Sequence, residues 1–177
     1  MKVHQIDSRA LELRRAFDSS FAETPREALE RTVDLLAIRI SGDAYVLRLG
    51  DLSGLAGYRK ITPLTSTAHG LLGLTSLRGN LVPVYDLRVL LGYAAAGTPR
   101  WLALVGVDTV TGFAFDGFEG FLRLPPEAVT VQQGEGNAGH VRELAQSSGQ
   151  VRRVVSFPSV IGAVTQRARQ IHSRKEA

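Results

Sequence analysis

Short β-prone runs joined by tight-turn signals dominate this chain from Val33 onward. The first runs predict two hairpins, with strands at 34–40 and 45–49 around Ser-Gly-Asp-Ala and at 71–77 and 81–85 around Arg-Gly-Asn. Glycine, asparagine and aspartate tolerate the backbone conformations that such turns require. Further strands are predicted at 101–107, 112–116, 129–132 and 151–155. This many short strands in 177 residues favours small barrels or a sandwich.

A weak internal repeat divides these strands into two related units. Residues 71–92 align without gaps with residues 141–162, and Gly79 falls on Gly149. Each copy reads as a strand, a glycine turn, a second strand and the start of a short helix. The repeat therefore predicts two similar β-rich subdomains within one chain.

The residues before the first strand read as helix. Apolar residues at 9–22 recur at three- and four-residue spacing, which places Leu13, Phe17 and Phe21 on one face of an amphipathic helix. That face either packs on its own domain, the commoner outcome, or is offered to a partner. Apolar residues at helical spacing also predict a C-terminal helix. We expect a helical extension at 1–32, a β domain at 33–165 and a basic helix end or tail at 166–177.

The composition argues against several classes of protein. The chain has no cysteine, which excludes disulfides, thiolate catalysis and cysteine-based zinc sites. It has no run of 18 apolar residues, and its charged first 20 residues lack the apolar stretch of a signal peptide, so a soluble intracellular protein is expected. A sequence pI of about 9.8 raises the alternative of a small basic β-barrel protein that binds nucleic acid. Positive charge gathers at the two ends of the chain, and the middle has no Lys/Arg cluster interleaved with aromatics, which disfavours that alternative.

An enzyme is not expected either. The chain has no Walker-type loop, no dinucleotide-binding glycine pattern after a strand and no nucleophile elbow, and its four histidines lack metal-ligand spacing. Asp86 illustrates the ordinary role of the acidic residues, because it precedes a short apolar run closed by Gly92 and is placed to cap a short helix. We therefore expect no catalytic residues, no metal and no cofactor.

The most informative segment is 73–87, which reads Gly-Leu-Thr-Ser-Leu-Arg-Gly-Asn-Leu-Val-Pro-Val-Tyr-Asp-Leu. Arg78 stands at the predicted hairpin tip, where a rigid turn can present its guanidinium group to a partner. A salt bridge within the domain is the alternative for this side chain. Pro83 lacks an N–H group, so its strand should be an edge, bulged or incompletely paired at that point.

This segment resembles the chemotaxis coupling protein family, the CheW-like domain, whose pattern is approximately G-[VIL]-x-x-[LI]-R-G-x-[VIL]-[VIL]-P-[VIL]-x-D-L. The structural positions of that motif are Gly73, Pro83, Asp86 and Leu87. The resemblance extends over about 33–165. It implies an all-β core of two intertwined five-stranded SH3-like β-barrels around a shared apolar core, with an N-terminal and a C-terminal helix.

The resemblance also implies a non-catalytic adaptor that couples chemoreceptors to a CheA-type histidine kinase through its barrel surfaces. The implied partners are the regulatory domain of that kinase and the signalling tip of a methyl-accepting chemoreceptor, at cytoplasmic receptor arrays on the inner membrane face and without membrane insertion. Many family members carry Glu where this chain has Gly54, which implies the loss of a charged receptor contact. The residues expected to contact partners are Arg78, Gly79, Asn80, Leu52, Leu55 and Tyr58.

Overall fold

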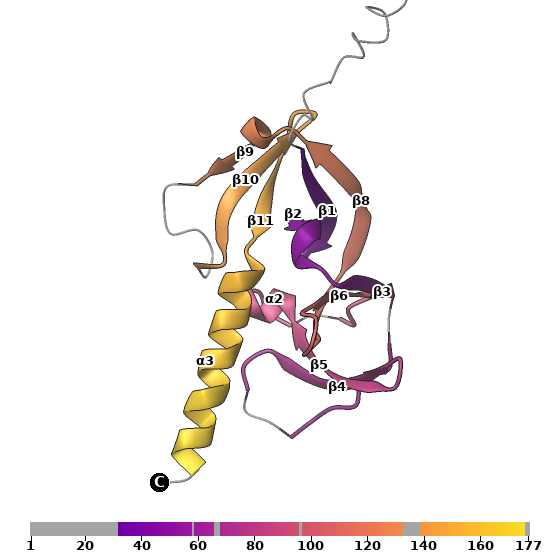
Figure 1. Cartoon of the computed structure of the whole chain (residues 1–177), viewed down its shortest axis with the longest axis vertical. Helices are drawn as coiled ribbons and strands as arrows, with labels where there is room; N and C mark the ends of the chain where they lie inside the picture. The colour runs from indigo at the N-terminus through magenta and orange to yellow at the C-terminus, as the bar shows by residue number, and fades with distance from the viewer. Residues whose placement is uncertain (1–31, 58, 66–67, 96, 133–138, 176–177) are drawn as a thin grey trace, which may run out of the picture. The chain divides into compact units, whose positions relative to one another are not determined.

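A computed structural model describes residues 32–57, 59–65, 68–95, 97–132 and 139–175 of the chain (Figure 1). The predicted helix at 9–22, with its face of Leu13, Phe17 and Phe21, lies outside the described residues. Tyr58 lies outside them as well. The predicted division into 1–32, 33–165 and 166–177 stays a prediction.

The described strands form two mixed sheets, each curled into a small SH3-like barrel. The first sheet has the order β8 (Gly117–Leu124), β1 (Val33–Ile40), β2 (Asp43–Arg48), β11 (Gln150–Val155), β10 (Val141–Ser147) and β9 (Val129–Val131). The second sheet has the order β3 (Gly54–Gly57), β6 (Trp101–Val105), β7 (Thr111–Phe115), β5 (Asn80–Asp86) and β4 (Leu71–Leu77). The expected all-β fold is confirmed, although the first sheet has six strands because the three-residue β9 pairs with β10.

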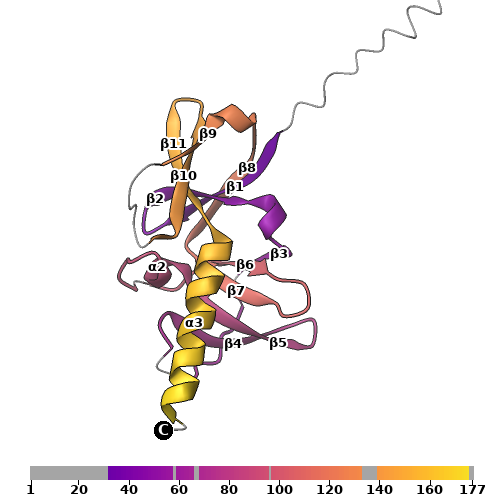
Figure 2. The ribbon, with the colours of Figure 1, turned by 60° about the vertical axis from the view of Figure 1, so that its left-hand side comes forward.

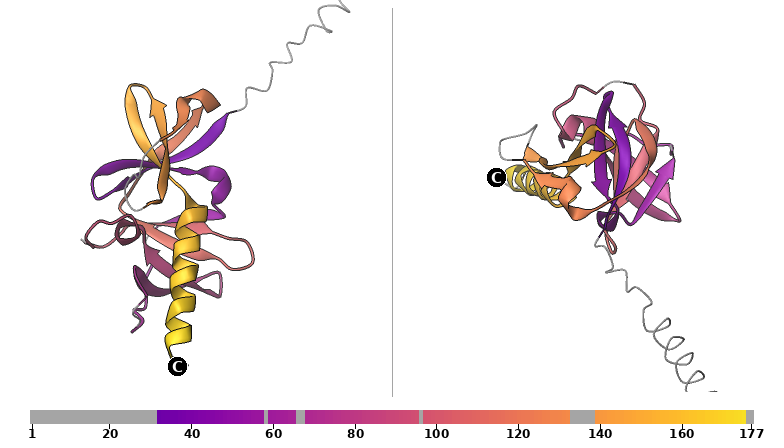
Figure 3. Two further views of the ribbon diagram at one scale, coloured as in Figure 1. Left: turned by 90° about the vertical axis from the view of Figure 1, so that its left-hand side faces the viewer. Right: turned by 90° about the horizontal axis from the view of Figure 1, so that it is seen from above.

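The two sheets are intertwined in the order of the chain. The hairpin β1–β2 begins the first sheet, the chain then builds the whole second sheet from β3 to β7, and β8 returns to pair with β1. Figures 1 and 2 show the two sheets at different levels of the domain, with α3 (Phe157–Lys175) running from the end of β11 past the second sheet. Figure 3 shows the same arrangement from the side and from above.

The internal repeat predicted from sequence is a structural repeat. In the hairpins β4–β5 and β10–β11, Leu71 pairs with Tyr85 and Val141 with Val155, each next to a register shift. Each hairpin then pairs in parallel with a strand of an antiparallel hairpin, β5 with β7 and β11 with β2. A helix follows each copy, α2 (Leu87–Leu90) in the first and α3 in the second.

The largest apolar core lies where the two barrels meet. Both sheets and both helices contribute fully buried side chains to it, which accounts for the shared core that the family resemblance implies. Burying each such side chain is worth about 1.5–3 kcal/mol, so this shared surface binds the barrels firmly together. Its members include Leu36, Ile38 and Tyr45 of the first sheet, Phe113 and Phe115 of the second, Leu87 of α2, and Phe157 and Val160 of α3.

Two motif residues shape the second sheet. Gly73 has a φ of 145°, and a Cβ atom there would lie 2.0 Å from the backbone oxygen of Thr62, which pairs with Leu74. Only glycine allows this close approach. Pro83 lies opposite Leu74, and the parallel pairing with β7 begins only at Val84, so the strand is incompletely paired at the proline, as predicted.

One predicted strand is too long. The run expected at 101–107 ends at Val105, because Gly106 has a φ of 103° and a Cβ there would lie 2.3 Å from the oxygen of Thr109. The turn toward β7 therefore begins earlier than the apolar run suggests.

Candidate partner-binding surface

Arg78 occupies the tip of the β4–β5 hairpin. It adopts a φ of 50° and is exposed, as are Gly79 and Asn80 beside it. Within the part of the chain that the structure describes, its side chain makes no hydrogen bond or ion pair. The alternative of an internal salt bridge is therefore not found, and the turn presents a guanidinium group to solvent.

The base of the same hairpin is held by a buried ion pair. Asp86 caps α2, as predicted, by accepting a hydrogen bond of 3.0 Å from the backbone N–H of Arg88. Its carboxylate also accepts bonds of 2.9 and 2.8 Å from the Arg88 side chain, and both side chains are at most 3% exposed. The hydrogen bond to Asp86 raises the pKa of Arg88 above its usual value, so the guanidinium group stays charged.

The ion pair extends to the first sheet. Arg88 donates a bond of 3.0 Å to Asp116, whose other carboxylate oxygen accepts a bond of 2.7 Å from the backbone N–H of Ser41 in the β1–β2 turn. Sequence reasoning missed Arg88. The available signal was a cation two residues after a capping aspartate, inside an otherwise apolar run.

Leu52 and Leu55 lie at the margin of the shared core rather than fully on the surface. Both are half-buried and pack against the core, and Leu55 belongs to β3, the edge strand of the second sheet. At Gly54 a Cβ atom would lie 3.3 Å from Cδ1 of Leu104, so a glutamate there would need Leu104 to move slightly.

An aromatic strip, formed by Trp101, Phe118 and Phe121, continues this margin. The ring centroids of Trp101 and Phe118 are 5.4 Å apart, and those of Phe118 and Phe121 are 5.5 Å apart. Phe121 is 65% exposed and lies on β8, the edge strand of the first sheet. Sequence reasoning did not single out these residues, because residues three apart on a regular strand lie on opposite faces, and the register shift between Phe118 and Gly120 is not readable from the sequence.

Ion pairs connect β8, the strand that carries Phe118 and Phe121, to strands β1 and β11 of the first sheet. Glu119, next to Phe118, accepts hydrogen bonds of 2.5 Å from both Arg39 of β1 and Arg152 of β11. The bond from Arg39 is the largest cause that lowers the pKa of Glu119 below its usual value. The strip is therefore an apolar surface with a charged border on one side.

Two absences apply to the described residues. No helix among them is long and apolar enough to cross a membrane. No group of three or more histidine, aspartate or glutamate side chains among them is arranged to hold a metal ion.

The two intertwined barrels and the exposed Arg-Gly turn agree with the CheW-type two-barrel domain that the resemblance implies. In agreement with this class, the CheW-like domain family matches residues 34–165. The chain belongs to that family.

A solved structure shares this fold. The scaffolding protein TtCheW from Thermoanaerobacter tengcongensis is 17% identical in sequence, with a TM-score of 0.63 over 71% of this chain and 89% of that chain. A comparison with curated proteins gives no significant match.

Proposed function

We propose that this chain is a non-catalytic adaptor in chemotaxis-type signal transduction, which couples chemoreceptors to a CheA-type histidine kinase. The observation that carries the proposal is Arg78, which stands in the family motif on a rigid turn and has no internal ion pair among the described residues. The similar solved protein is named a scaffolding protein, which supports the same role.

Two surfaces are available for the partners. The hairpin tip of Arg78, Gly79 and Asn80 offers a charged contact, and the aromatic strip with Leu52 and Leu55 offers an apolar one. Aromatic and arginine side chains dominate the binding energy of typical interfaces, particularly where the partner removes water from them. We propose that these surfaces, together with Tyr58, contact the kinase regulatory domain and the receptor signalling tip. The complex would form in the cytoplasm, at receptor arrays.

The nucleic-acid alternative receives little support from the charges. Six described arginines lie in ion pairs, which neutralises part of the basic charge that a phosphate backbone would meet. The arginines in ion pairs are Arg39, Arg48, Arg88, Arg123, Arg152 and Arg153. The basic side chains that form no ion pair within the described part of the chain are Arg59, Lys60, Arg78, Arg100 and Arg142.

The test is binding of the full chain to a purified CheA-type kinase and to a receptor signalling-tip fragment, measured by calorimetry. Arg78→Glu should weaken at least one of these affinities by more than about 1 kcal/mol, because a desolvated cation becomes an anion. Ser148→Glu is the matched control, since Ser148 has a φ of 48° at the same position of the β10–β11 turn. Equal affinities for wild type and Arg78→Glu would remove Arg78 from the interface, and no binding to either partner would refute the adaptor role.

A further inference from the structure

The two copies of the repeat end differently where each hairpin meets its helix. Tyr85 of β5 pairs with Phe113, and Val155 of β11 pairs with Leu47, so the two strand ends are matched in register. The next positions are Asp86 and Arg88 in the first copy and Ser156 and Pro158 in the second. A buried ion pair in one copy is thus replaced by two short uncharged side chains in the other.

In the first copy, the space between the end of the hairpin and the start of the helix is filled by the guanidinium group of Arg88. Arg88 is 3% exposed and donates hydrogen bonds to Asp86, to Asp116 at 3.0 Å and to the backbone oxygen of Gly97 at 3.3 Å. Asp116 follows strand β7, three residues after Phe113.

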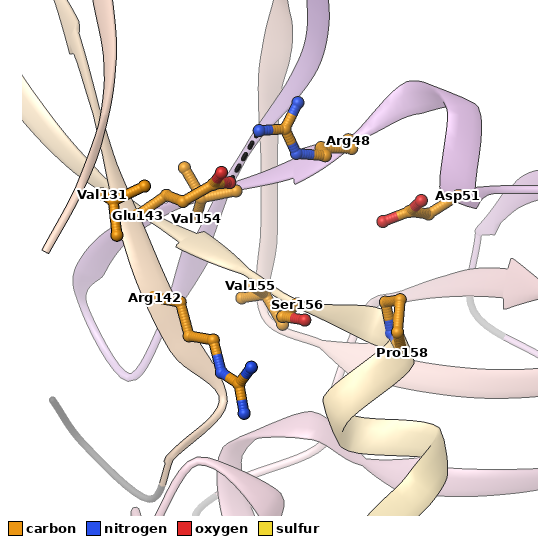
Figure 4. A pocket seen from close by; sticks show the side chains of 9 residues that line it. All are labelled: Arg48, Asp51, Val131, Arg142, Glu143, Val154, Val155, Ser156 and Pro158. Carbon is orange, nitrogen blue, oxygen red and sulfur yellow. Dashed lines mark hydrogen bonds and ion pairs between the residues drawn. The ribbon is translucent and has the colours of Figure 1, made fainter. Parts of the chain in front are cut away.

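In the second copy the matching place is part of an open pocket of about 350 Å³ (Figure 4). Strand β2, its following turn, β9, β10, β11 and the start of α3 supply the walls, so the pocket is built by segments distant in sequence. The lining residues are Arg48, Asp51, Val131, Arg142, Glu143, Val154, Val155, Ser156 and Pro158.

Some charged side chains of the pocket form ion pairs with each other, and others do not. Arg48 and Glu143 neutralise each other through a hydrogen bond of 2.7 Å between Nη2 and Oε2. Asp51 follows β2 four residues after Leu47, close to the place that Asp116 takes after β7. Within the described ranges, neither the Asp51 carboxylate nor the Arg142 guanidinium group has a side-chain hydrogen bond or ion pair, and burial raises the pKa of Asp51 above its usual value. Figure 4 shows Asp51 and Pro158 on one side of the pocket and Arg142 on the other.

We propose that this pocket binds the guanidinium group of an arginine from a partner protein, with Asp51 as its carboxylate acceptor. An arginine of the partner protein would occupy, in this barrel, the position that the chain's own Arg88 occupies in the other barrel. The lining valines, Val131, Val154 and Val155, offer apolar contacts for the aliphatic stem of an arginine, whose planar head matches a carboxylate. The inference rests on the pocket and the repeat, and not on the adaptor assignment.

The ligand chemistry is tested on the full-length ¹⁵N-labelled chain by following its backbone amide signals. Methylguanidinium should shift the amides of Asp51, Ser156 and Phe157, and methylammonium, which has the same charge without the planar fork, should bind several-fold more weakly. The peptide acetyl-Gly-Arg-Gly-amide should bind at least as tightly as methylguanidinium, since the proposed ligand is a protein side chain. Acetate should leave these amides unchanged.

Two variants test the assigned acceptor and the equivalence of the copies. Asp51→Asn should weaken methylguanidinium binding about tenfold or more, as expected for the loss of a charge-assisted hydrogen bond. Asp108→Asn, an exposed loop position, should change nothing. Pro158→Arg should abolish binding of the probe, because the chain would then supply the guanidinium group itself, as Arg88 does.

Four results would overturn the proposal. Methylguanidinium that causes no shifts, or equal shifts in Asp51→Asn, removes Asp51 as the acceptor. Acetate-induced shifts around Arg142 in place of methylguanidinium-induced ones would make this an anion site. Binding of methylguanidinium with no binding of the peptide would exclude a protein side chain as the ligand.

Discussion

The hairpins β4–β5 and β10–β11 have nearly the same backbone and different surfaces. Both turns place a non-glycine residue at positive φ before a glycine, Arg78 with 50° and Ser148 with 48°. Both strands carry the same register shift and lead into a helix that starts with a buried side chain, Leu87 or Phe157. The difference teaches that the backbone of the repeat needs only turn residues and apolar alternation, whereas its chemistry depends on individual charged positions.

The largest effect should come from breaking the buried pair that only one copy has. Asp86→Ala leaves Arg88 buried without its main partner, and we expect a loss of about 3 kcal/mol or more in the free energy of unfolding. Ser156→Ala at the matched position of the other copy should cost less than about 1 kcal/mol, since no buried charge depends on it. Urea unfolding measures both. Similar losses for the two variants would contradict the asymmetry described for the two hairpins.

A smaller but still large effect is expected at Gly73. In Gly73→Ala the new Cβ meets the Thr62 oxygen at 2.0 Å in a backbone conformation that alanine rarely adopts, so we expect about 2–3 kcal/mol of destabilisation. The matched position of the other copy is Glu143, which shows that only the second sheet requires glycine here. Gly57→Ala is the control, because nothing lies within 4 Å of its Cβ position. An unchanged urea midpoint for Gly73→Ala would disprove the close approach.

Partner affinity should distinguish the aromatic strip from the exposed side chains of the hairpin β10–β11. Phe121→Ser should weaken binding to kinase or receptor fragment by about 1–2 kcal/mol, provided that the strip is buried by a partner. Stability should change little, because Phe121 is already 65% exposed. Val151→Ser, with 54% exposure on β11, should leave both affinities unchanged. If Val151→Ser weakens binding more than Phe121→Ser in calorimetry, the binding surface includes the hairpin β10–β11 and not the aromatic strip.

The smallest effect should be on how the free energy of unfolding depends on pH. It concerns only the second copy of the repeat, whose strand β11 carries Arg152, an ion-pair partner of Glu119. Arg39 and Arg152 lower the pKa of Glu119 below its usual value, so this carboxylate stabilises the fold at pH values above its unfolded-state pKa. The contribution is lost as the pH falls below about 4.5 toward the lower folded pKa. Glu119→Gln should therefore lower stability at pH 7 slightly and reduce the decline between pH 5 and about 3 in urea unfolding. A pH profile identical to wild type would contradict the pairing.

Local signals in the sequence determined the hairpins, the repeat, the helix cap at Asp86 and the incomplete pairing at Pro83. Each depends on residues near one another in the chain: turn glycines, alternating apolar residues and a capping side chain. The family motif is likewise confined to 73–87. Such features can be predicted because the physics that sets them acts over a few residues.

Tertiary structure decided the rest. The return of β8 to β1, the addition of β9, the aromatic strip and the pocket beside Asp51 all join segments far apart in sequence. Arg88 meets Asp86 locally, but its further contacts to Asp116 and Gly97 come from segments that only the tertiary structure brings to its side. Strand register across such distances depends on the packing of the whole shared core, which no local pattern encodes.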